Sequence, residues 1–306
     1  MRKPLILRLV GSTARAWWDD DCTRLGASLA YYTLFAIAPV LLVATAIAGM
    51  VFGAEAVRGE IVGQLDHLVG REGALAVQSL LEGASQRRAG IFATVIGGIA
   101  FVVAATGAFL ELQVALNTIW RVKPNPGTNI KAFVMDRLRS FGLVVAIGFL
   151  LLVSLSVTAA LAALNAWLLG LSPDMPAVWN AASTLVSLLV TTGLFALLFR
   201  FLPDVRLRWR DVTTGAGVTA VLFTIGQQVI GLYLGQSNIA SSYGAAGSMM
   251  ILLLWVYYSC QILLFGAEFT RIYVQRDGAK AKPESFAVKD PHAVNPKSAL
   301  APLSKG

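Results

Sequence analysis

The chain has 306 residues, of which 56% are hydrophobic and only 14% are charged, and its formal net charge is +8. Soluble domains carry roughly 25% charged residues, so this composition excludes an ordinary soluble protein and predicts an integral membrane protein. The two cysteines and two histidines are too few and too dispersed for a disulfide framework or a zinc motif. We therefore expect no metal and no other cofactor.

Residues 1–27 form a basic N-terminal segment in which leucines and tryptophans alternate with arginines. Its apolar part is too short for a cleaved signal peptide. We expect an amphipathic helix at the cytoplasmic interface, where both tryptophan and arginine are stable. The segment contains Asp19, Asp20 and Asp21, which point about 100° apart on a helix and so do not converge on a metal. One or two of them are expected to cap or begin a helix.

Six uncharged stretches are long enough to cross a bilayer, which needs about 20 residues. They lie at approximately 28–53, 89–110, 141–169, 178–199, 212–236 and 244–267. All but four of the 25 lysines and arginines flank these spans on one side; the four exceptions are Arg58, Arg71, Arg87 and Arg88. The positive-inside rule therefore places both termini in the cytoplasm. The predicted fold class is all-α, with a six-helix transmembrane domain over residues 28–276.

Two regions outside the spans differ in character. The outer loop, residues 54–88, carries Val57, Ile61 and Leu65 at helical spacing, which predicts short amphipathic helices on the outer surface. Residues 277–306 are rich in lysine, proline, alanine and serine. We expect this tail to be disordered in the cytoplasm.

Polar side chains in the first span are the first candidates for a functional site. Tyr31 and Tyr32 lie near its start, and Pro39 lies near its middle. Proline removes one helical hydrogen bond and frees a carbonyl. The resulting kink is either plain architecture or part of a binding site, as in the broken helices of transporters.

The second span carries Gln113 and Asn117 on one helical face, with Glu111 just off it. We expect this helix to continue past the membrane edge to Trp120. Glu111 is interpreted as the partner of an arginine between the fourth and fifth spans. The alternative is a site for a proton or cation.

The fifth span holds Gln228, and the sixth holds Tyr257, Gln261 and Glu268 on one face. Charged and polar groups at membrane depth should face protein or water. One interpretation is a hydrogen-bonded seam between helices, with Glu268 paired to Arg271 three residues on. The other is the wall of a polar cavity open to the cytoplasm.

The loop between the fourth and fifth spans, RFLPDVRLRWRD, is short and basic. Pro203-Asp204 is a turn signal. The candidates for contact with a lipid headgroup or another anion are Arg206, Arg208, Trp209 and Arg210. Charge that only sets the topology explains them more simply.

Small residues in the spans indicate helix packing. The GxxxG pairs Gly49/Gly53 and Gly231/Gly235 join helices within a chain or between subunits. We interpret them as contacts within the chain and leave a homo-oligomer open. GAGVTA at 215–220 has two of the three glycines of a dinucleotide motif but lies inside a span, so it too indicates helix packing.

Four segments together resemble one known family. They are SLAYYTLFAIAPVLLVATAIAGMVFG, LNTIWRV, RFLPDVRLRWRDVTTGAGVTAVLF and SSYGAAGSMMILLLWVYYSCQILLFGAEFTR. They are similar to the YihY/BrkB family of bacterial inner-membrane proteins over roughly residues 14 to 275. The resemblance implies a six-helix, N-in/C-in protein of the bacterial plasma membrane. The family has been linked to serum resistance, and it has also carried a ribonuclease label that is widely regarded as a misassignment.

Three hypotheses for function follow. The first is a transporter, exporter or lipid-handling protein with a polar cavity, acting in envelope integrity or serum resistance. The second is a structural protein of the envelope that transports nothing. The third is a membrane nuclease, which is least favoured because the carboxylates are scattered and a metal-dependent nuclease needs several that converge. We therefore expect no enzyme and no catalytic residues, with membrane lipids and their anionic headgroups as partners and no nucleic acid.

Overall fold

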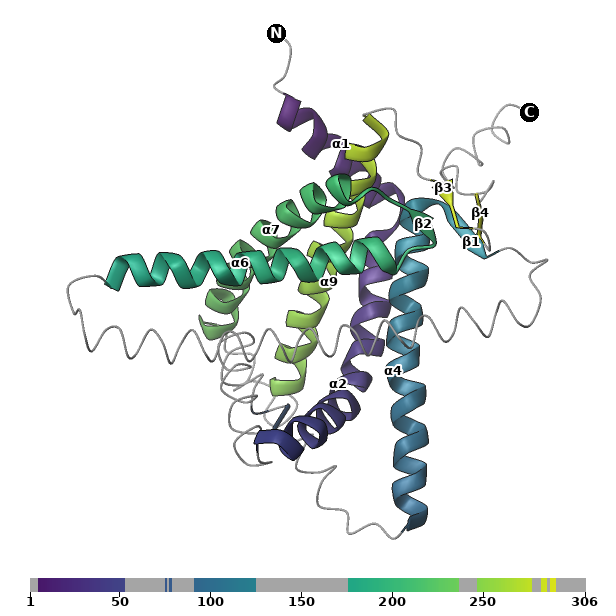
Figure 1. Cartoon of the computed structure of the whole chain (residues 1–306), viewed down its shortest axis with the longest axis vertical. Coiled ribbons are helices and arrows are strands. Elements are labelled where there is room, and N and C mark those ends of the chain that lie inside the picture. The colour runs from purple at the N-terminus through teal and green to yellow at the C-terminus, as the bar shows by residue number, and fades with distance from the viewer. Residues whose placement is uncertain are drawn as a thin grey trace.

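The computed structural model describes residues 5–52, 75, 77–78, 91–124, 176–236, 247–276, 282–284 and 287–289. The helices are α1 (Leu5–Asp19), α2 (Cys22–Phe52), α4 (Ile91–Trp120), α6 (Pro176–Phe201), α7 (Trp209–Gln236) and α9 (Gly247–Arg276). The strands are β1 (Val122–Pro124), β2 (Val205–Arg206), β3 (Lys282–Pro283) and β4 (Ala287–Lys289). The described chain is thus mostly helical, as predicted (Figure 1).

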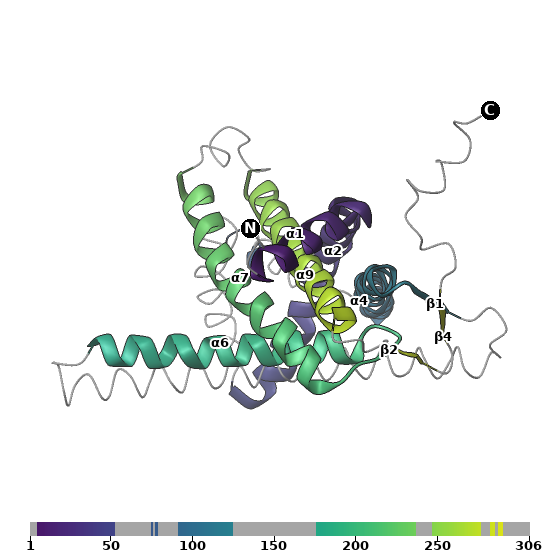
Figure 2. The same cartoon turned by 90° about the horizontal axis from the view of Figure 1, so that it is seen from above.

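Helix α9 is the centre of the arrangement. It contacts α7, α2, α4 and α1, and α2 also contacts α4. Seen from above, α7, α9, α2 and α4 follow one another in a row (Figure 2). Helix α6 packs on α7 but runs across the direction of α4 in both views. The described helices are therefore not a bundle of parallel spans, and the six-helix topology remains a prediction.

Within the described residues, three helices are long and apolar enough to cross a membrane. These segments are Thr184–Phe201, Trp209–Tyr233 and Met249–Gln275. They overlap the last three predicted spans. Helices α2 and α4 cover the first two, and α4 ends at Trp120, in agreement with its expected extension. The predicted span at 141–169 and nearly all of the outer loop at 54–88 lie outside the described residues.

Helices α7 and α9 approach each other closely through a reciprocal pair of small residues. A Cβ added at Gly215 would collide with the Thr270 side chain, and one added at Gly266 would collide with the Thr219 side chain. Each threonine hydroxyl donates to the carbonyl four residues earlier in its own helix, at 2.8 Å for Thr219 and 2.7 Å for Thr270. This arrangement lets two backbones meet without leaving a hydroxyl unpaired. GAGVTA is therefore a helix-packing motif, as predicted.

The described residues give the other glycine prediction no support. A Cβ added at Gly231 meets no described atom within 4 Å. This glycine does not join α7 to another described helix. The reason is its place on α7, because Gly215 and Gly226 occupy the face toward α9.

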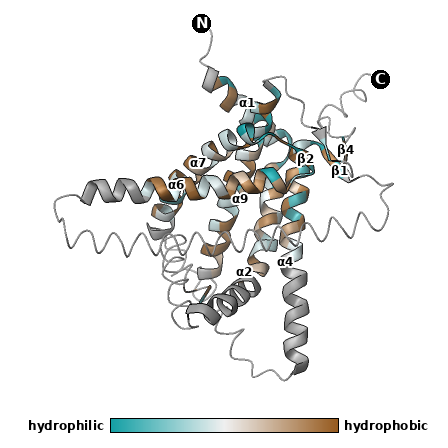
Figure 3. Cartoon of the chain, viewed as in Figure 1, coloured by the Kyte–Doolittle hydropathy of each residue, from teal (hydrophilic) through white to brown (hydrophobic). Residues whose placement is uncertain are grey.

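The main apolar core lies where α2, α4, α6, α7 and α9 converge beside β2. Its fully buried side chains include Leu116, Ile119, Phe199, Leu202 and Leu264. Hydrophilic residues gather around the neighbouring ends of α1, α7 and β2 (Figure 3). The polar groups that could act chemically therefore lie at one end of the apolar body.

Two segments of the predicted disordered tail are ordered. Strand β4 pairs antiparallel with β1, and β3 pairs antiparallel with β2. The Glu284 amide also donates to the Asp204 carbonyl at 3.0 Å, and the Glu284 carboxylate binds Arg206 at 2.9 Å. Composition predicted disorder here because the tail has few apolar side chains, but backbone pairing with an existing strand edge does not require them.

Helix α2 remains helical through Pro39. Figure 1 shows that α2 changes direction along its length. A proline inside a helix produces such a bend because its ring clashes with the carbonyl four residues earlier. The first predicted span is thus a bent helix that continues without a break.

Candidate functional site

A buried ion pair lies on α9, inside the segment that is apolar enough to span a membrane. Glu268 is 0% exposed and Arg271 is 3% exposed. The Arg271 guanidinium donates to Glu268 Oε2 from Nη2 at 2.6 Å and from Nε at 3.0 Å. The spacing of three residues puts both side chains on one helical face, as predicted.

The turn between α1 and α2 adds a second carboxylate to this pair. Asp20 Oδ2 lies 3.1 Å from Arg271 Nη2, and Asp20 Oδ1 lies 3.7 Å from Arg121 Nη2 at the end of α4. The Asp20 side chain is only 9% exposed. We call Asp20, Arg121, Glu268 and Arg271 the charge cluster, and it joins α1, α4 and α9 through side-chain charges.

The charge cluster is incompletely hydrogen-bonded. Glu268 Oε1 is buried and has no hydrogen-bond partner in the described structure. Asp20 Oδ2 is also buried, and its contact with Arg271 is close enough for an ion pair but lacks hydrogen-bond geometry. Both carboxylates contact the same nitrogen, Arg271 Nη2. Most buried polar atoms in proteins are paired, and these two oxygens lack a hydrogen-bond donor among the described residues.

The backbone on both sides of the Asp20–Arg121 contact is unusual. Asp21 has φ 50° and Arg121 has φ 56°, and they are the non-glycine residues with positive φ in the described part of the chain. This left-handed conformation is uncommon for residues with a Cβ, although Asp tolerates it better than Arg. Arg121 adopts it where α4 ends, which is the usual position for such a residue. Asp21 and Arg121, with their left-handed backbones, therefore lie at the two turns that flank the Asp20–Arg121 contact.

Cys22 begins α2 directly beside the charge cluster and is 0% exposed. Burial raises the pKa of its thiol above the usual range, and the negative charges of Glu268 and Asp20 add to the effect. The thiolate is the reactive form of cysteine. Cys22 is therefore an inert packing residue at neutral pH.

A second polar cluster lies between α4 and the turn before β2. Asp204 accepts hydrogen bonds from Gln113 Nε2 at 3.1 Å and from Asn117 Nδ2 at 2.7 Å. The Asp204 amide donates to Asn117 Oδ1 at 2.9 Å. All three residues are buried, and we call them the amide–aspartate cluster. The predicted polar face of the second span thus holds the Pro203-Asp204 turn in place.

Among the described residues, Glu111 contacts a serine and not the predicted arginine. Its Oε1 accepts a hydrogen bond of 2.5 Å from the Ser28 hydroxyl on α2. Both side chains are partly buried in the contact between α2 and α4. The sequence alone does not give the partner of Glu111, because that partner depends on which helix packs against α4.

The other predicted cavity residues are dispersed over different surfaces. Tyr31 and Tyr32 are exposed on α2, with their rings 5.7 Å apart, and Gln228 is exposed on α7. Tyr257 packs half-buried beside Val256. Gln261 lies against Gly26 and donates weakly to the Thr23 carbonyl at 3.4 Å. Pro39 is described only as part of the α2 backbone. The described part of the structure does not gather these residues around one cavity.

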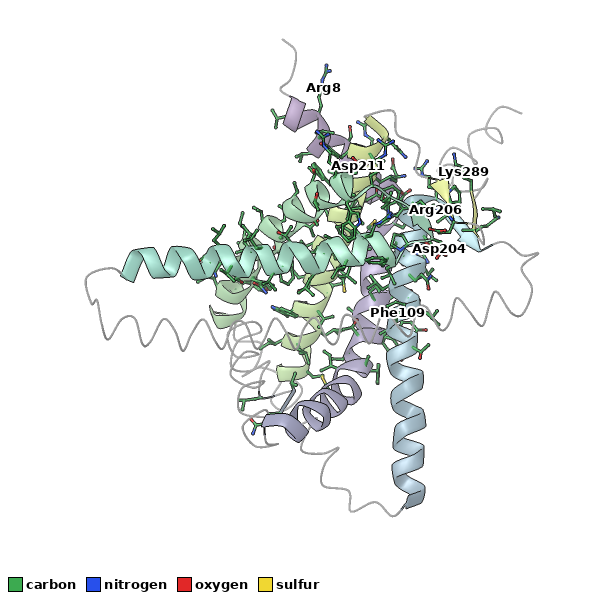
Figure 4. All side chains as sticks on the ribbon, viewed as in Figure 1. Arg8, Phe109, Asp204, Arg206, Asp211 and Lys289 are labelled. Atoms are coloured by element: carbon green, nitrogen blue, oxygen red, sulfur yellow. The ribbon has the colours of Figure 1, made fainter. Side chains whose placement is uncertain are left out.

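The basic loop before α7 contains Asp204, and Arg206 lies close to it (Figure 4). Arg206 pairs with Glu284, whereas Arg208 and Arg210 are exposed. Trp209 is 50% exposed and lies 5.9 Å from the Arg200 guanidinium. Three of the four predicted headgroup candidates are therefore open to an external anion.

Sequence reasoning did not identify Asp20 as part of a site. The run of three aspartates is visible, but the arginines that bind Asp20 lie on α9 and at the end of α4. The unusual signal is an acidic turn followed by a buried cysteine, since neither suits a simple interfacial helix.

The sequence model of the family described as "Virulence factor BrkB" matches residues 13–290. A UPF0761 membrane protein of Ralstonia nicotianae is 30% identical over 251 residues, which is 81% of this chain and 55% of that protein. A similar protein of Rhodospirillum centenum is 29% identical over 280 residues, covering 88% of this chain and 58% of its own length. The UPF0761 membrane protein YihY of Escherichia coli O1:K1 is 31% identical over 180 residues, or 58% of each chain.

No solved structure matches the chain. The chain spans about half the length of the curated relatives it matches. The relatives are named as membrane proteins, and three described helices are apolar and long enough to span a bilayer, so the location is a membrane. Because the family model covers most of the sequence, the chain belongs to the BrkB family of membrane proteins, which includes YihY.

Proposed function

We propose that the chain is a multi-pass transporter or exporter of the bacterial inner membrane, and that it moves a lipid or an anionic small molecule. One observation carries the proposal: the fully buried carboxylate of Glu268, with one unpaired oxygen, lies inside a segment apolar enough to span the membrane. Buried ion pairs rarely add stability over apolar side chains of similar volume. Ionisable groups at membrane depth commonly mark pathways for ions, protons or substrates.

The charge cluster could link a proton to a change of shape. A proton shared by Glu268 and Asp20 would supply the donor that the unpaired oxygens lack. It would also weaken the hold of both carboxyl groups on Arg271, which contacts each of them. The α1–α2 turn and α9 would then be free to separate. The basic loop at the same end would attract the anionic headgroup or solute.

The test is transport by purified full-length protein in liposomes with an imposed pH gradient. The substrates are a fluorescent phosphatidylglycerol, whose movement between leaflets is followed by dithionite quenching, and an entrapped anionic dye. We expect the wild-type protein to move one of them faster with the gradient than without it. Glu268→Gln should abolish the effect of the gradient. Glu284→Gln is the control for the gradient effect, which should persist, because this variant removes a carboxylate outside the charge cluster.

A second candidate function is a structural envelope protein that transports nothing. The observation in its favour is that most predicted cavity residues join helices, as in the amide–aspartate cluster and the Ser28–Glu111 bond. Wild-type liposomes that move neither probe, with or without a gradient, would support this candidate and contradict the first. Glu268→Gln would then change only the thermal stability of the protein.

We also propose that the chain is not an enzyme, and a nuclease remains the least favoured function. Asp20 and Glu268 each form an ion pair with Arg271, so their carboxylates do not form a shared metal site. Purified protein free of contaminating ribonuclease, assayed on RNA with Mn²⁺ or Zn²⁺, should release no product. Metal-dependent release that disappears in Glu268→Gln would overturn this expectation.

A further inference from the structure

A groove of about 490 Å³ runs along α1 and ends at the start of β1. The residues that line it are Leu7, Arg8, Gly11, Ser12, Arg15, Ala16, Asp19 and Arg121. The predicted headgroup candidates of the loop before α7 do not contribute to it. The groove is therefore a separate surface from the basic loop.

The side chains that line the groove carry mostly positive charge. Three arginines line it against one carboxylate, that of Asp19. Arg8, Ser12 and Arg15 recur at steps of four and three, so one face of α1 presents two guanidinium groups and a hydroxyl donor. Arg8 projects from α1 toward its N-terminal end, away from the helical body (Figure 4). One face of α1 therefore offers a phosphate several hydrogen-bond donors.

Arg121 contributes the third guanidinium of the groove. Its Nε is buried and has no hydrogen-bond partner in the described structure. Its nearest described carboxylate, Asp20, lies 3.7 Å from Nη2, which is a loose contact. The planar guanidinium suits the binding of two phosphate oxygens at once. The Arg121 side chain as a whole is 40% exposed, so an anion in the groove would bind the accessible part of the guanidinium and not the buried Nε.

The floor of the groove is empty at Gly11. A Cβ added there meets no described atom within 4 Å. The missing side chain is not needed for packing, and glycine lowers helix stability by about 1 kcal/mol relative to alanine. This position thus keeps space open between Arg8 and Arg15.

The apolar side chains of α1 favour a lipid over a soluble anion. Leu7 is 59% exposed and itself lines the groove, and Trp18 on the same helix is 62% exposed. Exposed leucine and tryptophan beside arginine are typical of helices that lie in the headgroup region. We propose that this groove binds the phosphate of an anionic phospholipid headgroup, with Arg8, Arg15 and Arg121 as donors and Leu7 against the acyl chain. The inference goes beyond the proposed function, because a protein that transports nothing could bind lipid in the same way.

The test is native mass spectrometry of the full-length protein in detergent, titrated with phosphatidylglycerol and, separately, with phosphatidylcholine. We expect phosphatidylglycerol adducts on the wild-type protein at concentrations where phosphatidylcholine gives few. Arg15→Gln should weaken phosphatidylglycerol binding about tenfold, since one charge-assisted contact to phosphate is lost. Arg24→Gln, which removes an exposed arginine on α2 outside the groove, is the matched control and should change binding less than about twofold.

A second variant separates the groove from its charge. Gly11→Leu fills the open floor, keeps every arginine and favours the helix, so it should fold and still lose phosphatidylglycerol binding. Wild-type affinity in both Arg15→Gln and Gly11→Leu would overturn the proposal. Competition by inorganic phosphate or glycerol 3-phosphate at the concentration of the lipid would also overturn it, in favour of a soluble anion. These outcomes concern binding alone, so they remain distinct from a failure of the transport assay.

Discussion

Two buried polar clusters lie at the same end of this protein, and they differ in how completely they are hydrogen-bonded. In the amide–aspartate cluster, both carboxylate oxygens, the amide and the carbonyl of Asp204 each have a partner. In the charge cluster, Glu268 Oε2 accepts two hydrogen bonds and Oε1 accepts none. A saturated cluster costs little once formed and serves as a joint. A cluster with an unpaired buried oxygen is less stable, and a proton or a rearrangement that supplies a donor would stabilise it.

The comparison predicts that the charge cluster is the more costly of the two to break. Arg271→Leu would leave Glu268 and Asp20 buried without their shared cation, and removal of one partner of a buried pair costs about 3–5 kcal/mol. The measurement is the free energy of unfolding in mixed micelles. Arg24→Leu, at an exposed position on α2, should cost less than about 0.5 kcal/mol.

The same variant has a second readout that reports directly on the cluster. Cys22 is fully buried beside it, so its thiol should resist maleimide in the wild-type protein, measured in a Cys260→Ala background. Arg271→Leu should make Cys22 reactive because the α1–α2 turn loses its anchor on α9. Unchanged labelling, together with unchanged stability, would mean that the charges of the cluster do not hold this turn.

Asp204→Ala tests the saturated cluster. Gln113 and Asn117 would keep buried amides without their acceptor, and each unsatisfied group costs about 1–3 kcal/mol, so we expect a loss of about 2–4 kcal/mol. Transport per folded molecule should remain at the wild-type rate, because a joint has no step to perform. Asp211→Ala, at the first turn of α7, is the control and should cost about 0.3–1 kcal/mol through its helix terminus. A loss of transport in Asp204→Ala at full folding would remove the distinction between the two clusters.

The two clusters also differ in how much of each could be predicted from the sequence. Contacts within one helix were predictable, because the spacing of Glu268 and Arg271 follows from helical geometry alone. The face that carries Gln113 and Asn117 was predictable for the same reason. Their partner Asp204 was recognised only as a turn residue, and Asp20 only as a cap. Those pairings depend on which helices meet, and the expected arginine partner of Glu111 was replaced by Ser28 for this reason.

Ser28→Ala examines a carboxylate of intermediate burial. Glu111 would lose a hydrogen bond of 2.5 Å, but it is only partly buried and water could replace the donor. We expect a cost of about 1 kcal/mol, within the usual range for one hydrogen bond. Thr118→Ala is a suitable control, because its hydroxyl bonds only within α4 and is exposed. A cost in Ser28→Ala as large as in Asp204→Ala would show that the contact between α2 and α4 excludes water.

Glu284→Ala tests the most exposed carboxylate among these variants. The Arg206–Glu284 pair is close, at 2.9 Å, but the side chains are 64% and 30% exposed. Surface pairs contribute about 0–1 kcal/mol, because water and salt screen both charges. We expect a change of less than about 1 kcal/mol that shrinks further at high salt, measured by the same unfolding experiment. A larger, salt-independent loss would mean that the pairing of β3 with β2 stabilises the Asp204 turn. The tail would then be part of the amide–aspartate joint, because the Glu284 amide already satisfies the Asp204 carbonyl.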